Sequence, residues 1–225
     1  MIKVTAFKWV PPFAQGHVRD HRVRWMLNEI GWQHDDRLLD TADQKSSNYR
    51  AEQPFGQVPV LEEDGRPPLF ESGAIVLDLA LRSGQLLPTD EVERAQVLQW
   101  YFAALNTLEM PLGMVAWAEL FTKSEAVKRD LRPEALGMAQ TRLAEVEAAL
   151  GDRDWLVGDQ FTVADLMMTS VLKSADGPDM IERYPRLQAY RDRVLSRPAY
   201  TAAIDAQCAA FADHGPADMK YGEGS

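Results

Sequence analysis

The sequence predicts a two-domain protein of mixed class, in which an α/β domain is followed by an all-α domain. In the first part of the chain, apolar residues alternate between strand spacing and helical spacing in the order βαβαββα. After residue 88 the strand signal disappears, and every later apolar pattern is helical. A chain of 225 residues is long enough for two modest domains, each with its own buried core.

These patterns also predict the domain boundaries. We expect the α/β domain at residues 1–83 and a short linker at 84–88. The helical domain is expected at 89–212. The remaining residues, 213–225, form a polar, glycine-containing tail.

The first strand and the first helix are predicted from apolar spacing. Alternating apolar side chains predict a strand at the start of the chain, at Ile2, Val4 and Ala6. Spacing of i, i+3, i+4 and i+7 then predicts a helix, at Val23, Met26, Leu27 and Ile30. Gly31 ends this helix, because glycine readily adopts the left-handed conformation that follows a helix.

The remaining elements of the α/β domain have weaker signals. A short strand around 37–39 is followed by a polar helix around 45–51. Two strands at 58–61 and 68–70 are joined by an Asp-Gly turn, which is typical of a hairpin. A helix that contains Ile75 and Val76 completes the domain.

The helical half contains two signals beyond its apolar faces. Pro111 lies inside a long helical pattern and is expected to kink or interrupt it, because proline lacks the N–H that the helix needs. Thr162 and Asp165 are predicted to form a capping box, in which the side chain of each residue accepts a hydrogen bond from the backbone N–H of the other. Phe161 and Leu166 flank the box at the positions of a hydrophobic staple. We assign this motif a structural role and no chemistry.

Composition and charge limit the partners and the compartment. A net charge of −10 argues against a nucleic-acid or anionic-membrane partner, since both require clustered cations. The single cysteine, Cys208, excludes an intrachain disulfide and suits a reducing compartment. Lys3 and Lys8 interrupt the first apolar run, whereas the apolar region of a signal peptide carries no charge. No apolar run approaches the length of a membrane span. We therefore expect a cytoplasmic protein.

Three motifs in a fixed order carry a resemblance to a known family. The segments "PFGQVPVL", "LFESGAIV" and "FTVADL" resemble the glutathione S-transferase superfamily, including its bacterial members, from Ile2 to about Phe211. The resemblance implies the GST fold, which is a thioredoxin-like glutathione-binding domain followed by an all-helical domain. It also implies a cis proline at Val58-Pro59, glutathione as co-substrate without a metal, and a two-fold homodimer.

The resemblance gives a physical role to Pro59 and its neighbours. A cis Val58-Pro59 bond leaves the backbone of Val58 facing outward, where the main chain of glutathione can add to it as an extra strand. The alternative is a proline that merely ends or protects a strand edge. Glu71 and Ser72 stand at a helix start and would hold the α-amine and α-carboxylate of the γ-glutamyl group. Ser72 alone is also a common helix cap.

Two further polar residues and an apolar cluster complete the predicted ligand contacts. Gln57 and Lys45 are candidate glutathione contacts, although a lysine in a polar loop is commonly plain surface. The family's second site takes a small hydrophobic electrophile. Flexible and aromatic side chains suit such a site, and we assign it Met110, Met114, Trp117 and Phe121, with Pro111, Val115 and Ala118 nearby. The alternative is ordinary helix core.

The loop after the first strand departs from the family pattern. Superfamily members place a tyrosine, serine or cysteine there against the glutathione sulfur, but residues 9–20 contain no hydroxyl and no thiol. The segment from Pro11 resembles the Cys-Pro-Phe-Ala loop of omega-like members, with Pro11 in the cysteine position. The remaining thiolate donors are the backbone N–H groups of Phe13 and Ala14, the Trp9 indole and the Gln15 amide, with Arg19 as a more distant charge. Of these, we assign the catalytic role to Phe13, Trp9 and Gln15.

Other reactive side chains give weaker signals. His17 and His21 are four residues apart, but no third ligand at a zinc-like spacing accompanies them. The arginines of the first helix, Arg19, Arg22 and Arg24, are interpreted as a solvated face, from which one guanidinium could reach an anionic ligand. Cys208 is interpreted as a small buried side chain and not a nucleophile.

Three functions are compatible with these residues. The first is a detoxifying glutathione transferase, which ionises the glutathione thiol and presents it to an electrophilic carbon. The second is a glutathione-dependent disulfide or peroxide reductase. The third is a binding protein that keeps only the fold, which the presence of Val58-Pro59, Glu71 and Ser72 disfavours.

Overall fold

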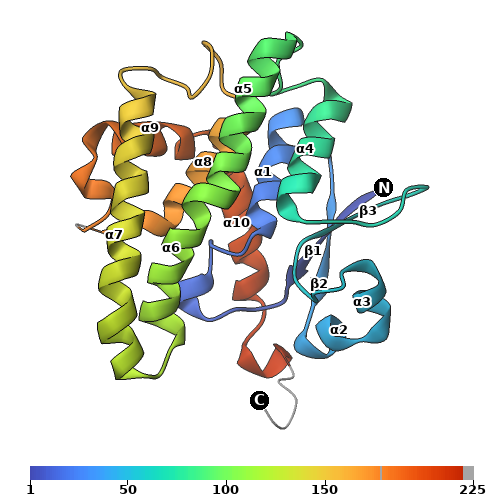
Figure 1. Cartoon of the computed structure of the whole chain (residues 1–225). Helices are drawn as coiled ribbons and strands as arrows, with labels where there is room; N and C mark the ends of the chain where they lie inside the picture. The colour runs from blue at the N-terminus through green and yellow to red at the C-terminus, as the bar shows by residue number, and fades with distance from the viewer. Residues whose placement is uncertain (178, 220–225) are drawn as a thin grey trace. The chain divides into compact units, whose positions relative to one another are not determined.

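The structure, a computed structural model, describes residues 1–177 and 179–219. Its described residues form two compact units, and the first contains a four-stranded mixed sheet (Figure 1). The strands are β1 (Ile2–Phe7), β2 (Asp35–Leu39), β3 (Val60–Glu63) and β4 (Leu69–Phe70), in the spatial order β2-β1-β3-β4. β1 is parallel to β2 and antiparallel to β3, and β3 is antiparallel to β4. The thioredoxin-like domain expected from the sequence is confirmed.

The helices of the first unit follow the predicted order with one difference. The helix expected around 45–51 is two short helices, α2 (Thr41–Lys45) and α3 (Ser47–Glu52). Ser46 separates them, because its extended backbone ends α2 while its hydroxyl accepts a hydrogen bond from Tyr49 N–H and begins α3. The other helices before residue 86 are α1 (Asp20–Ile30), α4 (Ser72–Ser83) and the 3₁₀ turn η1 (Pro12–Ala14).

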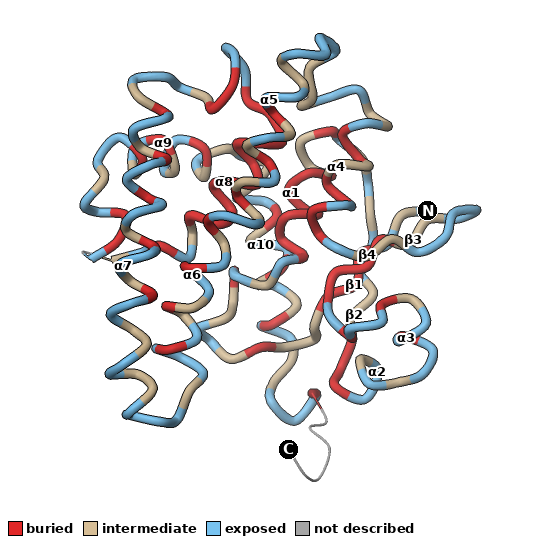
Figure 2. The backbone as a smooth tube through the Cα atoms, in the orientation of Figure 1, coloured by how far each residue is buried: buried red, intermediate tan, exposed pale blue. Residues whose placement is uncertain are grey.

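The core of this unit forms where α1 and α4 pack on each other and on the sheet (Figure 2). The apolar positions that predicted α1 are all buried, and Gly31 ends the helix with φ 71° as expected. β1 contributes Val4 and Ala6 to the core, while α4 contributes a stripe of Ile75, Val76, Leu79 and Ala80.

The last long helix, α10 (Pro198–Ala212), belongs to the first unit, although its sequence follows the helical half. It packs along α1, where Tyr200 meets Trp25 edge-on with ring centroids 4.9 Å apart. Near its other end, the Gln207 amide donates to Val18 C=O at 2.9 Å and to the Asp20 carboxylate at 2.7 Å. This grouping differs from the expected helical domain of 89–212, because apolar spacing shows that a helix is half-buried but not which partner buries it.

The second unit, Leu86–Ser196, contains helices joined by turns and loops and no strand among its described residues. Its α-helices are α5 (Glu91–Phe102), α6 (Glu109–Ala116), α7 (Glu125–Leu150), α8 (Val163–Leu172) and α9 (Pro185–Leu195). Short 3₁₀ turns η4 (Lys173–Ala175) and η5 (Ile181–Arg183) connect the last two. None of the described helices in either unit is both long enough and apolar enough to cross a membrane.

The predicted interruption at Pro111 is confirmed. Two π-helical segments flank α6, namely η2 (Ala103–Leu108) and η3 (Trp117–Phe121). In η2 the Glu109 N–H bonds to Ala104 C=O, five residues back. A wider turn just before Pro111 is expected, because the proline ring would otherwise clash with the carbonyl four residues earlier.

The capping box at the start of α8 is also confirmed, and the structure shows that Asp165 binds more groups than the motif requires. Its buried carboxylate accepts hydrogen bonds from the N–H of Thr162 at 2.9 Å and from the N–H of Leu156 at 2.9 Å. It also accepts from the hydroxyls of Thr162 at 3.0 Å and Tyr190 at 2.8 Å. Burial raises the pKa of Asp165 and also that of Tyr190, so the phenol remains a hydrogen-bond donor. One side chain thus ties α8, α9 and the preceding loop together.

Asp165→Ala is expected to lower the free energy of unfolding by about 3 kcal/mol or more, since it leaves several buried donors without an acceptor. Chemical denaturation of the variant, followed by circular dichroism, measures this loss. Asp159→Ala, which removes an exposed carboxylate from the same loop region, is the control and should change stability by less than about 0.5 kcal/mol. Equal stability of the two variants would contradict the assigned role.

Candidate functional site

The Val58-Pro59 peptide bond is cis, as the resemblance implied. It lies just before β3, which therefore begins at Val60 and not at Val58 as the apolar pattern predicted. Proline has no N–H to contribute to a strand ladder, which accounts for the later start. Val58 and Pro59 are both buried, whereas the side chain of Gln57 is exposed.

Buried hydroxyls hold the backbone on both sides of this bond. Tyr49 Oη donates to Gln57 C=O at 2.6 Å, and Val60 N–H donates to Thr5 Oγ1 at 2.7 Å. The two hydroxyls are 3.2 Å apart. Because Tyr49 gives its proton to Gln57, Thr5 must be the donor between them. Burial raises the pKa of Tyr49, which keeps the phenol protonated for this role.

This arrangement leaves the backbone polar groups of one residue open. Within the described residues, no hydrogen bond involves the backbone N–H or C=O of Val58, whereas the adjoining Gln57 and Val60 are held by side chains. A free N–H and C=O on one residue of a strand-like segment can pair with the main chain of an extended peptide. The free N–H and C=O are compatible with the role expected for the Val58 backbone, which remains a prediction.

Glu71 and Ser72 lie beside this segment because of the hairpin register. β3 and β4 pair Val60 with Phe70, so the two residues before β3 and the two after β4 leave the hairpin at the same end. Val58 and Pro59 are on one side of this end, and Glu71 and Ser72 are on the other. The hairpin thus brings together four residues that the sequence predicts as glutathione contacts.

Glu71 has an unusual backbone, with φ 71° and ψ 112°. A positive φ in a non-glycine residue costs about 1–3 kcal/mol and persists only where surrounding structure imposes it. Its carbonyl accepts the first hydrogen bond of α4, from Ile75 N–H at 2.9 Å, but its side chain does not cap the helix. The exposed carboxylate therefore remains available to a cation.

Ser72 is the first residue of α4, and only 5% of it is exposed. Its hydroxyl accepts a hydrogen bond from Arg22 Nη1 of α1 at 3.3 Å. The start of α4 therefore combines the partial positive charge of a helix N-terminus with a guanidinium, and both favour an anion.

The expectation that Arg19, Arg22 and Arg24 form a solvated helix face is wrong for two of the three. Arg22 is 4% exposed and Arg24 is 1% exposed, because α4, α10 and β1 pack around the helix, whereas Arg19 is exposed. Arg24 is paired with Asp20 at 2.8 Å and with Asp36 at 2.7 Å. Burial raises the pKa of Asp20 despite this pairing, and the two aspartates outweigh burial to raise the pKa of Arg24.

Lys45 and Gln57 are both exposed polar residues near this segment. Lys45 ends α2, and the Gln44 side chain before it donates to Gly56 C=O, which brings α2 against the loop that leads to Val58. The structure is thus compatible with both residues as ligand contacts, and each remains a prediction.

In the loop after β1, several donor groups already form hydrogen bonds within the loop itself. Ala14 N–H donates to Pro11 C=O at 2.8 Å inside the η1 turn, so it is not available to a thiolate as the sequence suggested. The Gln15 side-chain amide donates to Val10 C=O at 3.1 Å, which leaves its second N–H. Phe13 is exposed, and the Trp9 side chain is half-buried.

The histidines and the cysteine are not grouped with other possible metal ligands among the described residues. His17 precedes α1, and the buried His21 contacts Val18 C=O through Nδ1 at 2.8 Å. Among the described residues, no three His, Cys, Asp or Glu side chains cluster closely enough to hold a metal ion. Cys208 is half-buried on α10 and not fully buried as expected.

The residues assigned to the electrophile site lie in the second unit and differ in exposure. Met110, Trp117 and Phe121 are 62%, 47% and 60% exposed, and Met114 is half-buried. By contrast, the neighbouring residues Pro111, Val115 and Ala118 are buried, as in ordinary helix core.

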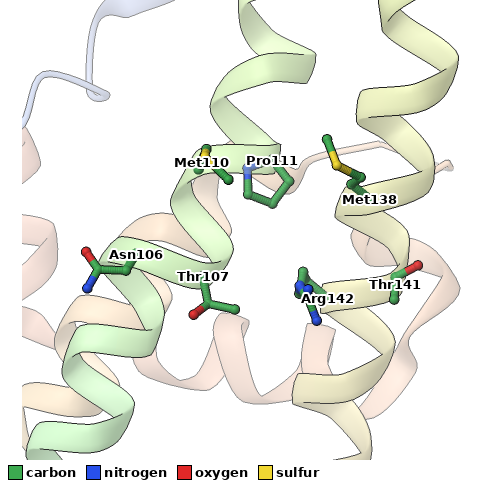
Figure 3. A pocket seen from close by; sticks show the side chains of 7 residues that line it. All are labelled: Asn106, Thr107, Met110, Pro111, Met138, Thr141 and Arg142. Atoms are coloured by element: carbon green, nitrogen blue, oxygen red, sulfur yellow. The ribbon is translucent and has the colours of Figure 1, made fainter.

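A pocket of about 330 Å³ lies between the η2–α6 segment and α7 (Figure 3). It is lined by Asn106, Thr107, Met110, Pro111, Met138, Thr141 and Arg142. Met110 is the one assigned residue that lines it. The pocket thus does not bring the four predicted electrophile contacts together.

Sequence reasoning missed Thr5 and Tyr49 as parts of the site, and it did not single out Arg22 among the three arginines of which one could reach an anionic ligand. Thr5 and Tyr49 belong to a strand and a short helix, and only tertiary packing brings them to the cis peptide. Arg22 is one of three arginines on a polar helix face, and spacing alone does not distinguish it from the exposed Arg19.

Comparisons with known proteins agree with this geometry. The model of the glutathione S-transferase N-terminal domain matches residues 13–80, and that of the C-terminal domain matches residues 107–198. Hematopoietic prostaglandin D synthase of Gallus gallus is 33% identical over 80% of this chain and 87% of its own length. Glutathione S-transferase GstA of Escherichia coli O157:H7 is 29% identical over 73% of this chain and 80% of its own.

Solved structures show the same fold. A glutathione transferase from Burkholderia graminis, which has two glutathione molecules bound per subunit, is 25% identical, with a TM-score of 0.80 over 91% of this chain and 88% of its own. Ure2p in complex with glutathione is 20% identical, with a TM-score of 0.77 over 91% of this chain and 94% of its own. Together, the two matched domains and the relatives show that the chain belongs to the glutathione S-transferase superfamily.

Proposed function

We propose that the protein is a glutathione transferase, which binds glutathione and delivers its thiolate to a small hydrophobic electrophile. The observation that carries this proposal is the open backbone of Val58 beside Glu71 and Ser72, at one end of the β3–β4 hairpin. Glutathione is a short extended peptide with a free γ-glutamyl α-carboxylate and α-ammonium, so it offers a complement to each of these groups.

Each group has a separate role in binding. The Val58 N–H and C=O pair with the peptide main chain. Ser72 and the N-terminus of α4 bind the α-carboxylate, and the exposed Glu71 carboxylate binds the α-ammonium. Gln57 and Lys45 contact the remaining polar groups. The glutathione bound to the transferase from Burkholderia graminis supports this choice of ligand.

For catalysis, the loop after β1 must favour the thiolate over the thiol. The proposed donors are Phe13 N–H, the Trp9 indole and the second N–H of the Gln15 amide, because this loop contains no tyrosine, serine or cysteine. The thiolate sulfur then forms a bond to an electrophilic carbon, and the displaced electron pair goes to a leaving group or to a proton.

The electrophile is proposed to contact Met110, Met114, Trp117 and Phe121. Their flexible or aromatic side chains, none of which is fully buried, suit apolar molecules of varied shape. Conjugation of such molecules is a detoxifying reaction. The single cysteine agrees with a reducing, cytoplasmic location.

A glutathione-dependent disulfide or peroxide reductase is the second candidate. The absence of a hydroxyl or thiol from residues 9–20 favours it, since glutathione itself would then supply the sulfur chemistry. A non-catalytic glutathione-binding protein is the third. All three share the binding site and differ in what happens to the thiol.

Ser72→Ala is expected to weaken glutathione binding by about 1.5–3 kcal/mol, because it removes a charge-assisted hydrogen bond to the carboxylate. Isothermal titration calorimetry measures the change. The matched control is Ser83→Ala at the other end of the same helix, which should bind as the wild type does. Equal affinity of Ser72→Ala and wild type would reject the assignment, and no binding by wild type would favour a protein that keeps only the fold.

The thiol of bound glutathione is expected to have a pKa below its ordinary value of about 8.5, because donors aimed at the sulfur stabilise the thiolate. Ultraviolet thiolate absorbance, recorded against pH for the bound and the free tripeptide, tests this. Since the donors are several and partly backbone, single variants at Trp9 or Gln15 should shift the pKa back only in part. An unshifted pKa would contradict the transferase mechanism and favour reduction or plain binding.

We also propose a two-fold homodimer, with the thioredoxin-like domain of one chain against the helical domain of the other. Exposed apolar side chains on both units, such as Phe55 and Phe102, support an association of this kind. Sedimentation velocity at micromolar concentration should give twice the chain mass of 25.3 kDa. A monomer mass would remove the proposal.

A further inference from the structure

The contact between Arg22 and Ser72 has a chemical consequence for the carboxylate subsite, and the inference rests on the proposed binding of glutathione. A guanidinium can only donate hydrogen bonds, and a serine hydroxyl has one proton and two acceptor lone pairs. Because Arg22 Nη1 donates to Ser72 Oγ at 3.3 Å, it occupies a lone pair and leaves the hydroxyl proton to point elsewhere.

We propose that Arg22 is a positioning residue, which fixes the Ser72 hydroxyl as a donor and makes this subsite selective for a carboxylate over a neutral amide. The hydrogen bonds run in one direction, from guanidinium to hydroxyl to ligand oxygen. Such chains strengthen when their final acceptor is charged. A carboxamide could still accept one bond, but it would gain less from the positive charge behind the serine.

The surroundings of Arg22 support this role. The residue is buried, so its charge is poorly screened by water. It lies next to the first turn of α4, whose N-terminus adds a second source of positive potential. The exposed carboxylate of Glu71 lies one residue away on the outer side. A zwitterion can therefore bind in one orientation, with its carboxylate inward and its ammonium outward.

The position of Arg22 is fixed by its own helix. Two positions before it, Asp20 binds Arg24 and the Gln207 amide, which secures the first turn of α1. Arg24, the other buried arginine of α1, is bonded to Asp20 and Asp36. Of these two buried arginines, Arg22 is the one that contacts the predicted ligand site.

The test compares two ligands with three proteins. Isothermal titration calorimetry measures the affinity of wild type, Arg22→Met and Arg22→Gln for glutathione and for its analogue with the γ-glutamyl α-carboxylate converted to an amide. Wild type is expected to prefer glutathione by at least about tenfold, which is 1.4 kcal/mol. Both variants should lose most of this preference, chiefly through weaker binding of glutathione. A general loss of fold stability would weaken both ligands together and leave their ratio unchanged.

Two controls separate the possible outcomes. Arg66→Met removes a half-exposed positive charge from the same unit and should keep the wild-type ratio. The substitution Arg22→Met should weaken glutathione binding less in the Ser72→Ala background than in wild type, because part of the effect of Arg22 passes through the serine. If wild type binds glutathione and Ser72→Ala weakens it, but both Arg22 variants keep the tenfold preference, this inference fails and the proposed function stands. No binding by wild type overturns both.

Discussion

The pairing of Val60 with Phe70 is the constraint on which the candidate site depends. It fixes the register of the β3–β4 hairpin, so that the peptide before one strand and the helix start after the other meet at a common end. A shift by one residue would move Ser72 away from Val58 and turn the apolar side chains of β3 to the opposite face. The buried Thr5 and Tyr49 then hold Gln57 C=O and Val60 N–H, while the N–H and C=O of Val58 have no partner among the described residues.

Much of this arrangement could be predicted from the sequence because the signals are local. The alternation of Ile2, Val4 and Ala6, the proline at 59 and the capping box at Thr162 each act within a few residues, and the structure contains all three features. The order of the elements followed from the same signals. The Glu71-Ser72 pair was recognisable because it stands where strand spacing changes to helical spacing.

What the sequence could not predict depends on contacts between distant residues. Arg22 and Arg24 were predicted to be exposed, because the burial of a charged side chain depends on partners in other elements, such as Ser72 and Asp36. The separation of α2 from α3 and the engaged Ala14 N–H depend on how single hydrogen bonds are shared in short turns. A propensity pattern does not contain that information. The same limit applies to α10, whose partner is a helix at the other end of the chain.

The position of α10 has a consequence for the order in which the protein can be completed during synthesis. A ribosome makes α1 before the second unit, but the helix that covers α1, and the Gln207 amide that binds Val18 and Asp20, emerge only after the whole second unit. The second unit is continuous in sequence and has all its described helices available before then. During synthesis the second unit can therefore fold before the first unit is complete. This differs from the usual order, in which N-terminal domains fold first.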